Sequence, residues 1–389
     1  MYIEYLTIAF ILIPLYILVI SRLNIRLSTA LFIYAYRAIF SIGYLTYAKN
    51  DFADANKYIR GFAVGFYNER SGIIYRFVDF IGNYLHIKGY ALYALFGLFG
   101  AVGCCFLYCA IKKCNIRNVE KINNLSAIFC FLPSLTFWTL APGKDSICFF
   151  AISFALYEYV KLNDNSLKLN FNIIISILIL FLIRPHVGAS FILAYSIFYL
   201  TKIKKKKDLY IRLTILSIVS LSFLIIIPFL QKFASIENIN FLDSISLLEE
   251  RFSVLNKTQL NLNYIGRVFF YLFTPLPLIN FNPLYIADYI NTFFIIYFLF
   301  TILKDQKSHR NILSNPLFIY SMILLLMLPL ITFNPGVAAR QKWMVLPPLI
   351  ISLKKNRYLN YRKIRNSLRS PSITCLLYTS DAADERSSV

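Results

Sequence analysis

The chain has little charge, and it is especially poor in acidic residues. Only 15% of its 389 residues are charged, and 19 acids stand against 40 Lys and Arg. A soluble domain carries roughly 25% charged and roughly 45–50% apolar residues, whereas 58% of this chain is hydrophobic. With a mean hydropathy of +0.61, the composition argues against an ordinary soluble protein and predicts a polytopic membrane protein.

Histidine is also scarce, and the cysteines do not form a metal-binding pattern. The three histidines lie far apart in the sequence, and Cys104, Cys105 and Cys109 lie inside one apolar run. A zinc site needs about four ligands, usually on turns. The sequence contains no Walker loop and no nucleotide-binding fingerprint. We therefore expect no metal and no cofactor, and neither an ATP-driven pump nor a nucleotide-sugar enzyme.

The end of the chain differs in character from the Lys/Arg/Asn-rich sequence before it. Residues 375–389 begin with Cys-Leu-Leu-Tyr-Thr-Ser, which resembles the translation of a transposon-end sequencing adapter. A genuine polar tail is the alternative. We interpret 375–389 as non-native and leave it out of fold reasoning. Residues 1–374 are then expected to form a single integral membrane domain.

Eleven stretches are apolar enough to be membrane-spanning helices, a count that we take to lie between nine and thirteen. They are 5–21, 28–47, 89–111, 125–141, 146–160, 171–184, 187–201, 211–230, 285–303, 316–333 and 343–353. Residues 5–20 lack a charged leader and a small-residue cleavage site, so they are interpreted as the first span. The predicted fold class is all-α, a polytopic transmembrane helical bundle.

The segments between these stretches differ in charge. Those on one predicted side (22–27, 112–124, 161–170, 202–212, 304–311 and 354–374) hold 24 Lys and Arg and four acids. The two largest on the other side, 48–88 and 231–267, hold ten basic and eight acidic residues. The basic side is therefore predicted to be cytoplasmic, with anionic lipid rather than nucleic acid as its partner. The N-terminus and both large loops then face outward, and 48–88 is expected to contain amphipathic helices on the outer membrane face.

Polar residues interrupt the apolar stretches at four places, which all open outward on this topology. They are Asp51, Asp54 and Tyr58 after the second stretch, Lys144 and Asp145 between the fourth and fifth, Arg184 and His186 between the sixth and seventh, and Arg340 and Lys342 before the last. Ionisable groups in or beside membrane spans are functional candidates by default. Each cluster also has a structural interpretation, as a helix start, a snorkelling arginine, a headgroup anchor or a solvated loop.

Together these groups favour phosphate chemistry. Arg184, Arg340 and Lys144 are predicted to bind a phosphate or diphosphate, because guanidinium groups recognise such oxygens bidentately. His186 is a candidate general base near neutral pH, and Asp54 is the alternative base. Asp51, Tyr58, Asp145 and Lys342 are predicted to support this site.

With these residues the chain resembles bacterial polysaccharide polymerases of the Wzy/EpsG type. The resemblance spans most of residues 30–350. It rests on Asp54-Ala55-Asn56-Lys57-Tyr58, on Pro133-Ser134, Phe137-Trp138 and Gly143-Lys144-Asp145, on Arg184-Pro185-His186, and on Arg340 before the last apolar stretch. It implies a GT-C-like helical fold, undecaprenyl-diphosphate-linked glycans as donor and acceptor, Arg184 and Arg340 as diphosphate ligands, and His186 or Asp54 as the base. The short segment 334–342 departs from the family, which often carries a large outward loop late in the chain.

The expected function is polymerisation of lipid-linked repeat units on the outer face of the bacterial cytoplasmic membrane, for exopolysaccharide, capsule or O-antigen. A flippase and a chain-length regulator are the expected protein partners. Two alternatives remain open. One is a GT-C glycosyltransferase that uses a polyprenyl-phosphate sugar, with Asp51 or Asp54 as base. The other is a non-enzymatic flippase, although such proteins often contain two related halves and no repeat is visible here.

Overall fold

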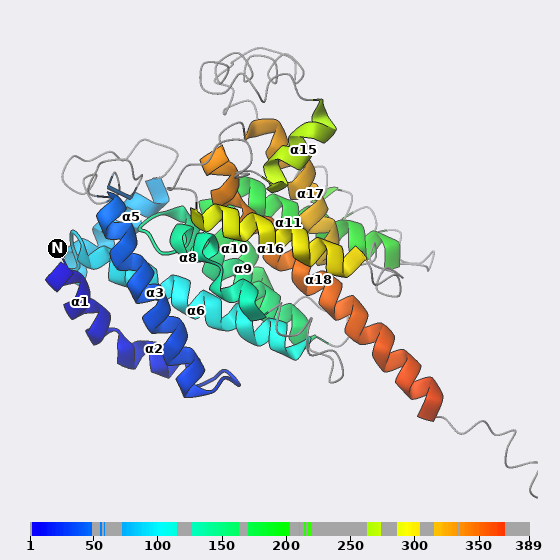
Figure 1. The fold of residues 1–389 in the computed structure, drawn as a ribbon, viewed down its shortest axis with the longest axis horizontal. Coiled ribbons are helices and arrows are strands. Elements are labelled where there is room, and N and C mark those ends of the chain that lie inside the picture. The colour runs from blue at the N-terminus through cyan, green and yellow to red at the C-terminus, as the bar shows by residue number, and fades with distance from the viewer. Residues whose placement is uncertain are drawn as a thin grey trace, which may run out of the picture.

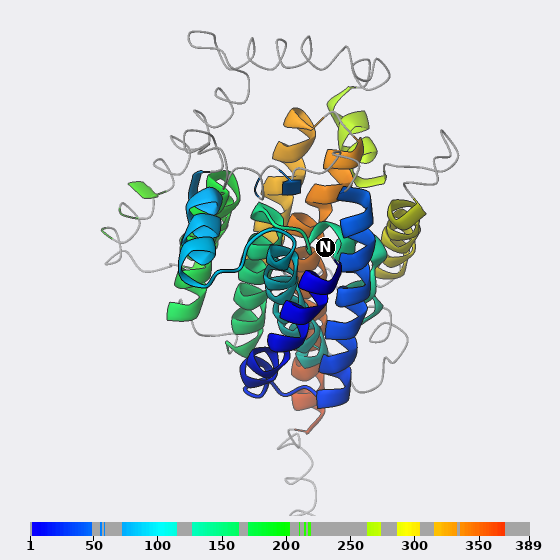
Figure 2. The same ribbon diagram turned by 90° about the vertical axis from the view of Figure 1, so that its left-hand side faces the viewer.

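The computed structural model describes residues 2–48, 55, 56, 58, 72–114, 127–162, 170–202, 210, 214, 217, 218, 263–273, 286–303, 315–332 and 335–369. Within these residues every regular element is a helix. The long helices lie side by side in one bundle, as the two perpendicular views show (Figure 1, Figure 2). The prediction of an all-α fold is therefore confirmed.

The helices follow the apolar pattern of the sequence. They are α1 (Tyr2–Ile11), α2 (Ile13–Ile20), α3 (Leu27–Ala48), α5 (Gly72–Tyr84), α6 (Ala91–Lys113), η1 (Phe129–Phe131), α8 (Pro133–Trp138), α9 (Lys144–Lys161), α10 (Phe171–Ile183), α11 (Pro185–Lys202), α15 (Tyr264–Phe273), α16 (Ile286–Leu303), α17 (Pro316–Ile331) and α18 (Pro335–Arg369). Nine of the eleven apolar stretches coincide with these helices, and a tenth, 125–141, is helical only in part. The remaining one, 211–230, lies largely outside the described residues.

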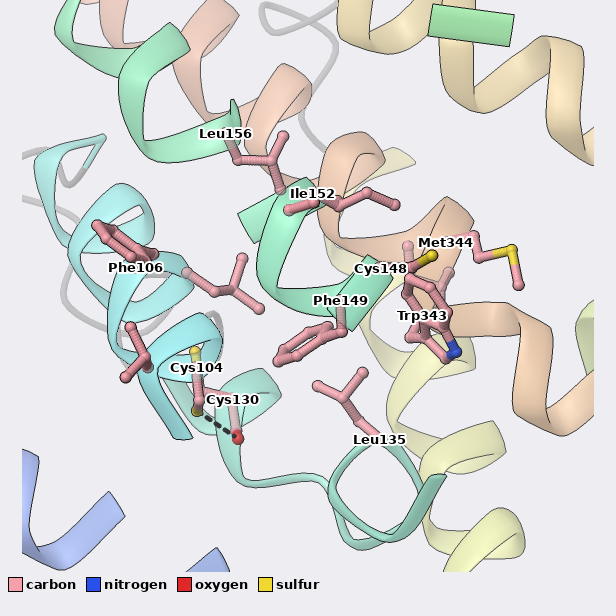
Figure 3. Close-up of a cluster of buried hydrophobic side chains, with 14 of the residues drawn as sticks. Cys104, Phe106, Cys130, Leu135, Cys148, Phe149, Ile152, Leu156, Trp343 and Met344 are labelled. Atoms are coloured by element: carbon pink, nitrogen blue, oxygen red, sulfur yellow. Dashed lines mark hydrogen bonds between the residues drawn. The ribbon is translucent and has the colours of Figure 1, made fainter. Parts of the chain in front are cut away.

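The core lies between α6 and α9. Nearly all of α6 is buried, and it packs against α1, α3 and α9. Figure 3 shows Phe149 of α9 between Phe106 of α6 and Trp343 of α18. The rings of Phe149 and Trp343 meet edge to face, with centroids 6.2 Å apart. These contacts hold the start of α18 against the start of α9, where the polar residues lie.

The predicted fourth span is a broken helix. Residues 125–141 contain only η1 and the short α8, which ends at Trp138. Arg37 of α3 closes this end, because its Nη2 donates to the Thr139 carbonyl at 3.0 Å and to the Thr139 hydroxyl at 2.5 Å. Non-helical backbone inside a helical bundle needs such partners. The arginine therefore fixes the turn that leads into α9.

A second break separates α10 from α11. It falls at Arg184, where Pro185 follows and cannot continue the hydrogen-bond ladder of α10. The two helices pack on each other. A Cβ atom on Gly188 would lie 2.6 Å from the Phe181 backbone, so only glycine permits this close approach. The predicted interruption between the sixth and seventh stretches is thus present.

The last helix is much longer than predicted. The sequence predicts loops at 334–342 and 354–374, but α18 runs without interruption from Pro335 to Arg369 and extends beyond the other helices (Figure 1). Proline is favoured in the first helical turn, and Lys and Arg are good helix formers. The loop prediction is therefore wrong for 335–342 and for 354–369. At the far end, Lys355 donates to the carbonyls of Tyr159 and Leu162 at the end of α9.

Two helical segments in the described part of the chain, Tyr2–Ile20 and Ala91–Lys113, are long and apolar enough to cross a bilayer. The second is mostly buried inside the bundle. A core helix that does not cross a membrane has the same property. Shorter apolar helices are Phe171–Ile183, Tyr264–Phe273, Ile286–Phe298 and Pro316–Leu330. The number of membrane spans stays a prediction.

Candidate functional site

Three of the predicted site residues form one ion-pair cluster. Nη2 of Arg184 donates to Oδ1 of Asp145, and Nε of Arg340 donates to Oδ2 of the same carboxylate. The side chain of Asp145 is only 5% exposed, against 13% for Arg184 and 26% for Arg340. One buried carboxylate therefore joins two cations that lie 156 residues apart in the sequence.

Three helix junctions bring these groups together. Gly143 precedes α9 with φ of 150°, a conformation that essentially only glycine adopts. Lys144 and Asp145 follow in the first turn of α9, where an acid is favoured by the helix dipole. Arg184 stands at the break between α10 and α11, and Arg340 lies in the second turn of α18. All of them are therefore held by the ends of packed helices.

Arg184 is the more enclosed of the two arginines. Its guanidinium carbon lies 5.8 Å from the centroid of the Trp343 ring, and its Nη1 donates to the sulfur of Met344 at 3.8 Å. Its Nε is buried and makes no hydrogen bond. The arginine thus has a fixed aromatic support and a donor still available to an oxygen ligand.

Two buried tyrosines lie near Arg184. Tyr271 of α15 and Tyr320 of α17 both interact electrostatically with it. Each hydroxyl is buried and makes no hydrogen bond. Buried polar atoms normally have partners, but buried hydroxyls without one also occur elsewhere in the described residues, as at Tyr93.

Lys144 and His186 complete the positive end of the bundle. Burial and the positive charge of Arg184 lower the pKa of Lys144 to about 8. Burial, followed by the charges of Arg184 and Lys144, lowers the pKa of His186 to about 3. His186 is therefore neutral at pH 7 but binds a proton weakly, which favours hydrogen bonding over general-base catalysis.

Tyr58 lies beside this cluster. A Cβ atom on Gly143 would lie 3.2 Å from the Tyr58 ring, and the rings of Tyr58 and Tyr75 of α5 are tilted against each other with centroids 5.0 Å apart. Tyr58 thus lies next to the turn that precedes Lys144 and Asp145, and its supporting role stays a prediction. Asp54, the alternative base, and Asp51, predicted to support the site, lie outside the described residues.

Lys342 does not join the cluster, contrary to the prediction. It is 2% exposed and interacts with Asp288 of α16, whose carboxylate accepts a hydrogen bond from Ser134. Burial lowers the pKa of Lys342 to about 8, and Asp288 partly offsets this effect. Helix geometry explains the difference, because residues 340 and 342 lie about 200° apart around a helix axis. A loop prediction does not distinguish the two positions.

The buried pair Asp288–Lys342 and the buried Arg37 are not among the contacts predicted from the sequence. Arg37 is 1% exposed in the middle of α3, and its guanidinium lies 5.5 Å from the Phe149 ring centroid. The signal was available, because an arginine within an apolar stretch needs partners inside the bundle. The pairing of Asp288 with Lys342 could not be found in this way, since it joins helices far apart in the sequence.

The cluster is suited to binding phosphate oxygens. Arg184, Arg340 and Lys144 place three cationic groups near the one carboxylate of Asp145. Among the described residues no group of three His, Cys, Asp or Glu side chains is placed to hold a metal ion. Comparison of the chain with protein-family models, with curated proteins and with solved structures finds no match.

Proposed function

We propose that the chain is an integral membrane glycosyltransferase that polymerises polyprenyl-diphosphate-linked glycan units on the outer face of the bacterial cytoplasmic membrane, like the Wzy/EpsG polymerases that its sequence resembles. The observation that carries this proposal is the cluster of Arg184, Arg340, Lys144 and Asp145. In the reaction, the bond between the anomeric carbon and the lipid diphosphate breaks as the acceptor oxygen attacks. The arginines would neutralise the diphosphate that leaves.

The number of cationic groups at the site favours a diphosphate over a monophosphate. A glycan linked through a diphosphate diester carries two negative charges, and a sugar linked through a phosphate diester carries one. Two guanidinium groups and one ammonium group near one point can contact the oxygens of two phosphate groups. This arrangement supports the polymerase over the glycosyltransferase that uses a polyprenyl-phosphate sugar.

The surface of the bundle supports a membrane location. One stripe of α10 exposes Phe171, Ile174, Leu178 and Leu182, each about half or more exposed. Similar apolar residues are exposed along α1, α2 and α16. Contiguous exposed apolar faces on several helices, combined with buried arginine, lysine and aspartate inside, reverse the usual arrangement of a soluble protein.

The proposal is tested in cells that make the lipid-linked repeat unit. Arg184→Ala and Arg340→Ala should lower polymer formation by roughly 10²–10³-fold, while single repeat units still reach the outer face. Lys112→Ala is the control, because Lys112 is exposed at the end of α6 that lies away from the arginines. This variant should make normal polymer. Normal polymer in both arginine variants would contradict the proposal. Repeat units retained on the cytoplasmic leaflet would indicate a flippase instead.

A further inference from the structure

The carboxylate of Asp145 fills the place where the two arginines converge. Its two oxygens each accept a hydrogen bond from a different arginine, and its side chain is almost completely buried. An oxygen of a bound diphosphate would need the same Nη2 and Nε donors. The carboxylate and the diphosphate therefore compete for one position.

Other groups at the site show that the donors exceed what Asp145 uses. Nε of Arg184 and the hydroxyls of Tyr271 and Tyr320 are buried without a hydrogen bond. A carboxylate offers two oxygens, whereas a diphosphate diester offers four non-bridging ones. A diphosphate bound to Arg184 can also accept a hydrogen bond from its Nε, which Asp145 leaves unused, and this supplies a reason for the exchange.

From this arrangement we infer that Asp145 is an internal ligand of the cation site, which the substrate diphosphate displaces, and that the displaced carboxylate then takes the proton of the acceptor hydroxyl. The inference rests on the proposed function. It adds a competition for the cation site and names Asp145 as the general base. His186 and the residues outside the described part of the chain are then not needed as the base.

The transfer step balances with these groups alone. The acceptor O–H bond breaks and its proton passes to a carboxylate oxygen of Asp145. The acceptor oxygen forms a bond to the anomeric carbon, and the bond from that carbon to the diphosphate oxygen breaks, with its electron pair remaining on the diphosphate. Loss of the proton from Asp145 to solvent restores the carboxylate. Its return to Arg184 and Arg340 then helps to expel the polyprenyl diphosphate.

Structure and charge favour Asp145 over His186 as the base. His186 has a pKa of about 3, because burial and two neighbouring cations oppose its protonation. Asp145 is held by Arg184 and Arg340. It can accept a proton only after the diphosphate has replaced it as their partner. Displacement from the arginines would leave both of its oxygens able to accept a hydrogen bond from the acceptor hydroxyl.

The test compares Asp145→Asn with Asp288→Asn in the purified full-length protein in detergent. Asp288 is the matched control, because it is equally buried (4% exposed against 3%) and also interacts with a cation, but it lies away from the arginines. The probe is dimethyl diphosphate, a diester with two charges, and its affinity is read from thermal stabilisation. Dimethyl phosphate, with one charge, is the reference ligand.

We expect Asp145→Asn to bind dimethyl diphosphate about tenfold more tightly than the wild type, because the site no longer has to release its own carboxylate. The same variant should lose polymer formation by about 10²-fold or more. Asp288→Asn should keep the wild-type affinity. Weaker binding by Asp145→Asn would mean that Asp145 only positions the arginines, and retained polymer formation would exclude it as the base.

Asp145→Glu keeps the charge and separates a folding defect from a catalytic one. It should restore part of the polymerisation, which Asp145→Asn should not. If the wild type does not bind dimethyl diphosphate and tolerates loss of both arginines, the proposed function itself fails. If it binds the diester and needs both arginines, but Asp145→Asn binds no more tightly and polymerises normally, only the role of Asp145 is wrong.

Discussion

Lys144 is the one site cation whose charge changes in an accessible pH range. Burial and Arg184 lower its pKa to about 8, so it is mostly charged at pH 7 and mostly neutral at pH 9. We expect the affinity for dimethyl diphosphate to fall roughly tenfold between these pH values, a change of ~1.4 kcal/mol. The probe is a diester and does not itself titrate in this range. The dependence therefore reports on the protein, and thermal stabilisation at each pH measures it.

Lys144→Arg is the control, because arginine stays charged at pH 9, and its affinity should hardly change with pH. An equal loss in this variant would assign the pH dependence to another group. The stability of the empty protein should change in the opposite sense. A lysine whose folded pKa is below its unfolded value of ~10.4 binds fewer protons when folded, so stability rises between about pH 8 and 10. Lys342 shares this contribution.

At single residues, the sequence predicts chemical type better than contacts. Arg184, Arg340, Lys144 and Asp145 are recognisable because charged residues interrupt apolar stretches, and the structure brings all four together. Lys342 is recognised by the same rule but points to another partner. The rule uses only local composition, whereas the side to which a helical residue points depends on where the helix begins.

Close packing of α6 on α9 depends on Gly103. A Cβ atom there would lie 2.9 Å from the Phe150 Cα atom and 3.2 Å from the Phe149 ring. Gly103→Ala should therefore separate the two helices and lower the free energy of unfolding by ~1–3 kcal/mol. The denaturant midpoint of the protein in detergent measures this change.

Gly43 of α3 is the matched control. A Cβ atom at this position would meet nothing within 4 Å, so Gly43→Ala should stabilise the helix by ~0.5–1 kcal/mol through helix propensity. A stabilising effect of Gly103→Ala as well would show that α6 and α9 are further apart than described here.

At the level of elements, apolar length predicts where helices lie, and proline predicts some of their breaks. Pro142-Gly143 and Pro185 mark the turns before α9 and α11 correctly. Pro335 marks the start of α18, but the polar residues that follow it suggest a loop. Lys342 is buried against Asp288 and Trp343 against Phe149. These long-range contacts stabilise the first turns of α18, and no local pattern contains them.

The whole molecule has two chemically different ends. Arg184, Arg340 and Asp145 meet at one end of the bundle, and Lys355 closes α9 at the other. The sequence predicts this polarity from the uneven distribution of Lys and Arg between alternate loops, because that distribution is a property of the whole chain. Most of those loops lie outside the described residues, so their contribution rests on charge alone.

The orientation of these ends decides which substrates the site can reach. The six cysteines in the described part of the chain are buried, so they should react slowly with a membrane-impermeant thiol reagent, and Cys375 can be replaced by Ser. His86, before α6, and Asn24, between α2 and α3, are both exposed and lie at opposite ends of the bundle. Each is replaced by Cys in turn. We expect labelling of His86→Cys on intact cells, and labelling of Asn24→Cys only after permeabilisation. Labelling in the reverse order would place the arginines in the cytoplasm, where nucleotide-linked sugars are the donors, and a polymerase of outward-facing lipid-linked glycans would then be excluded.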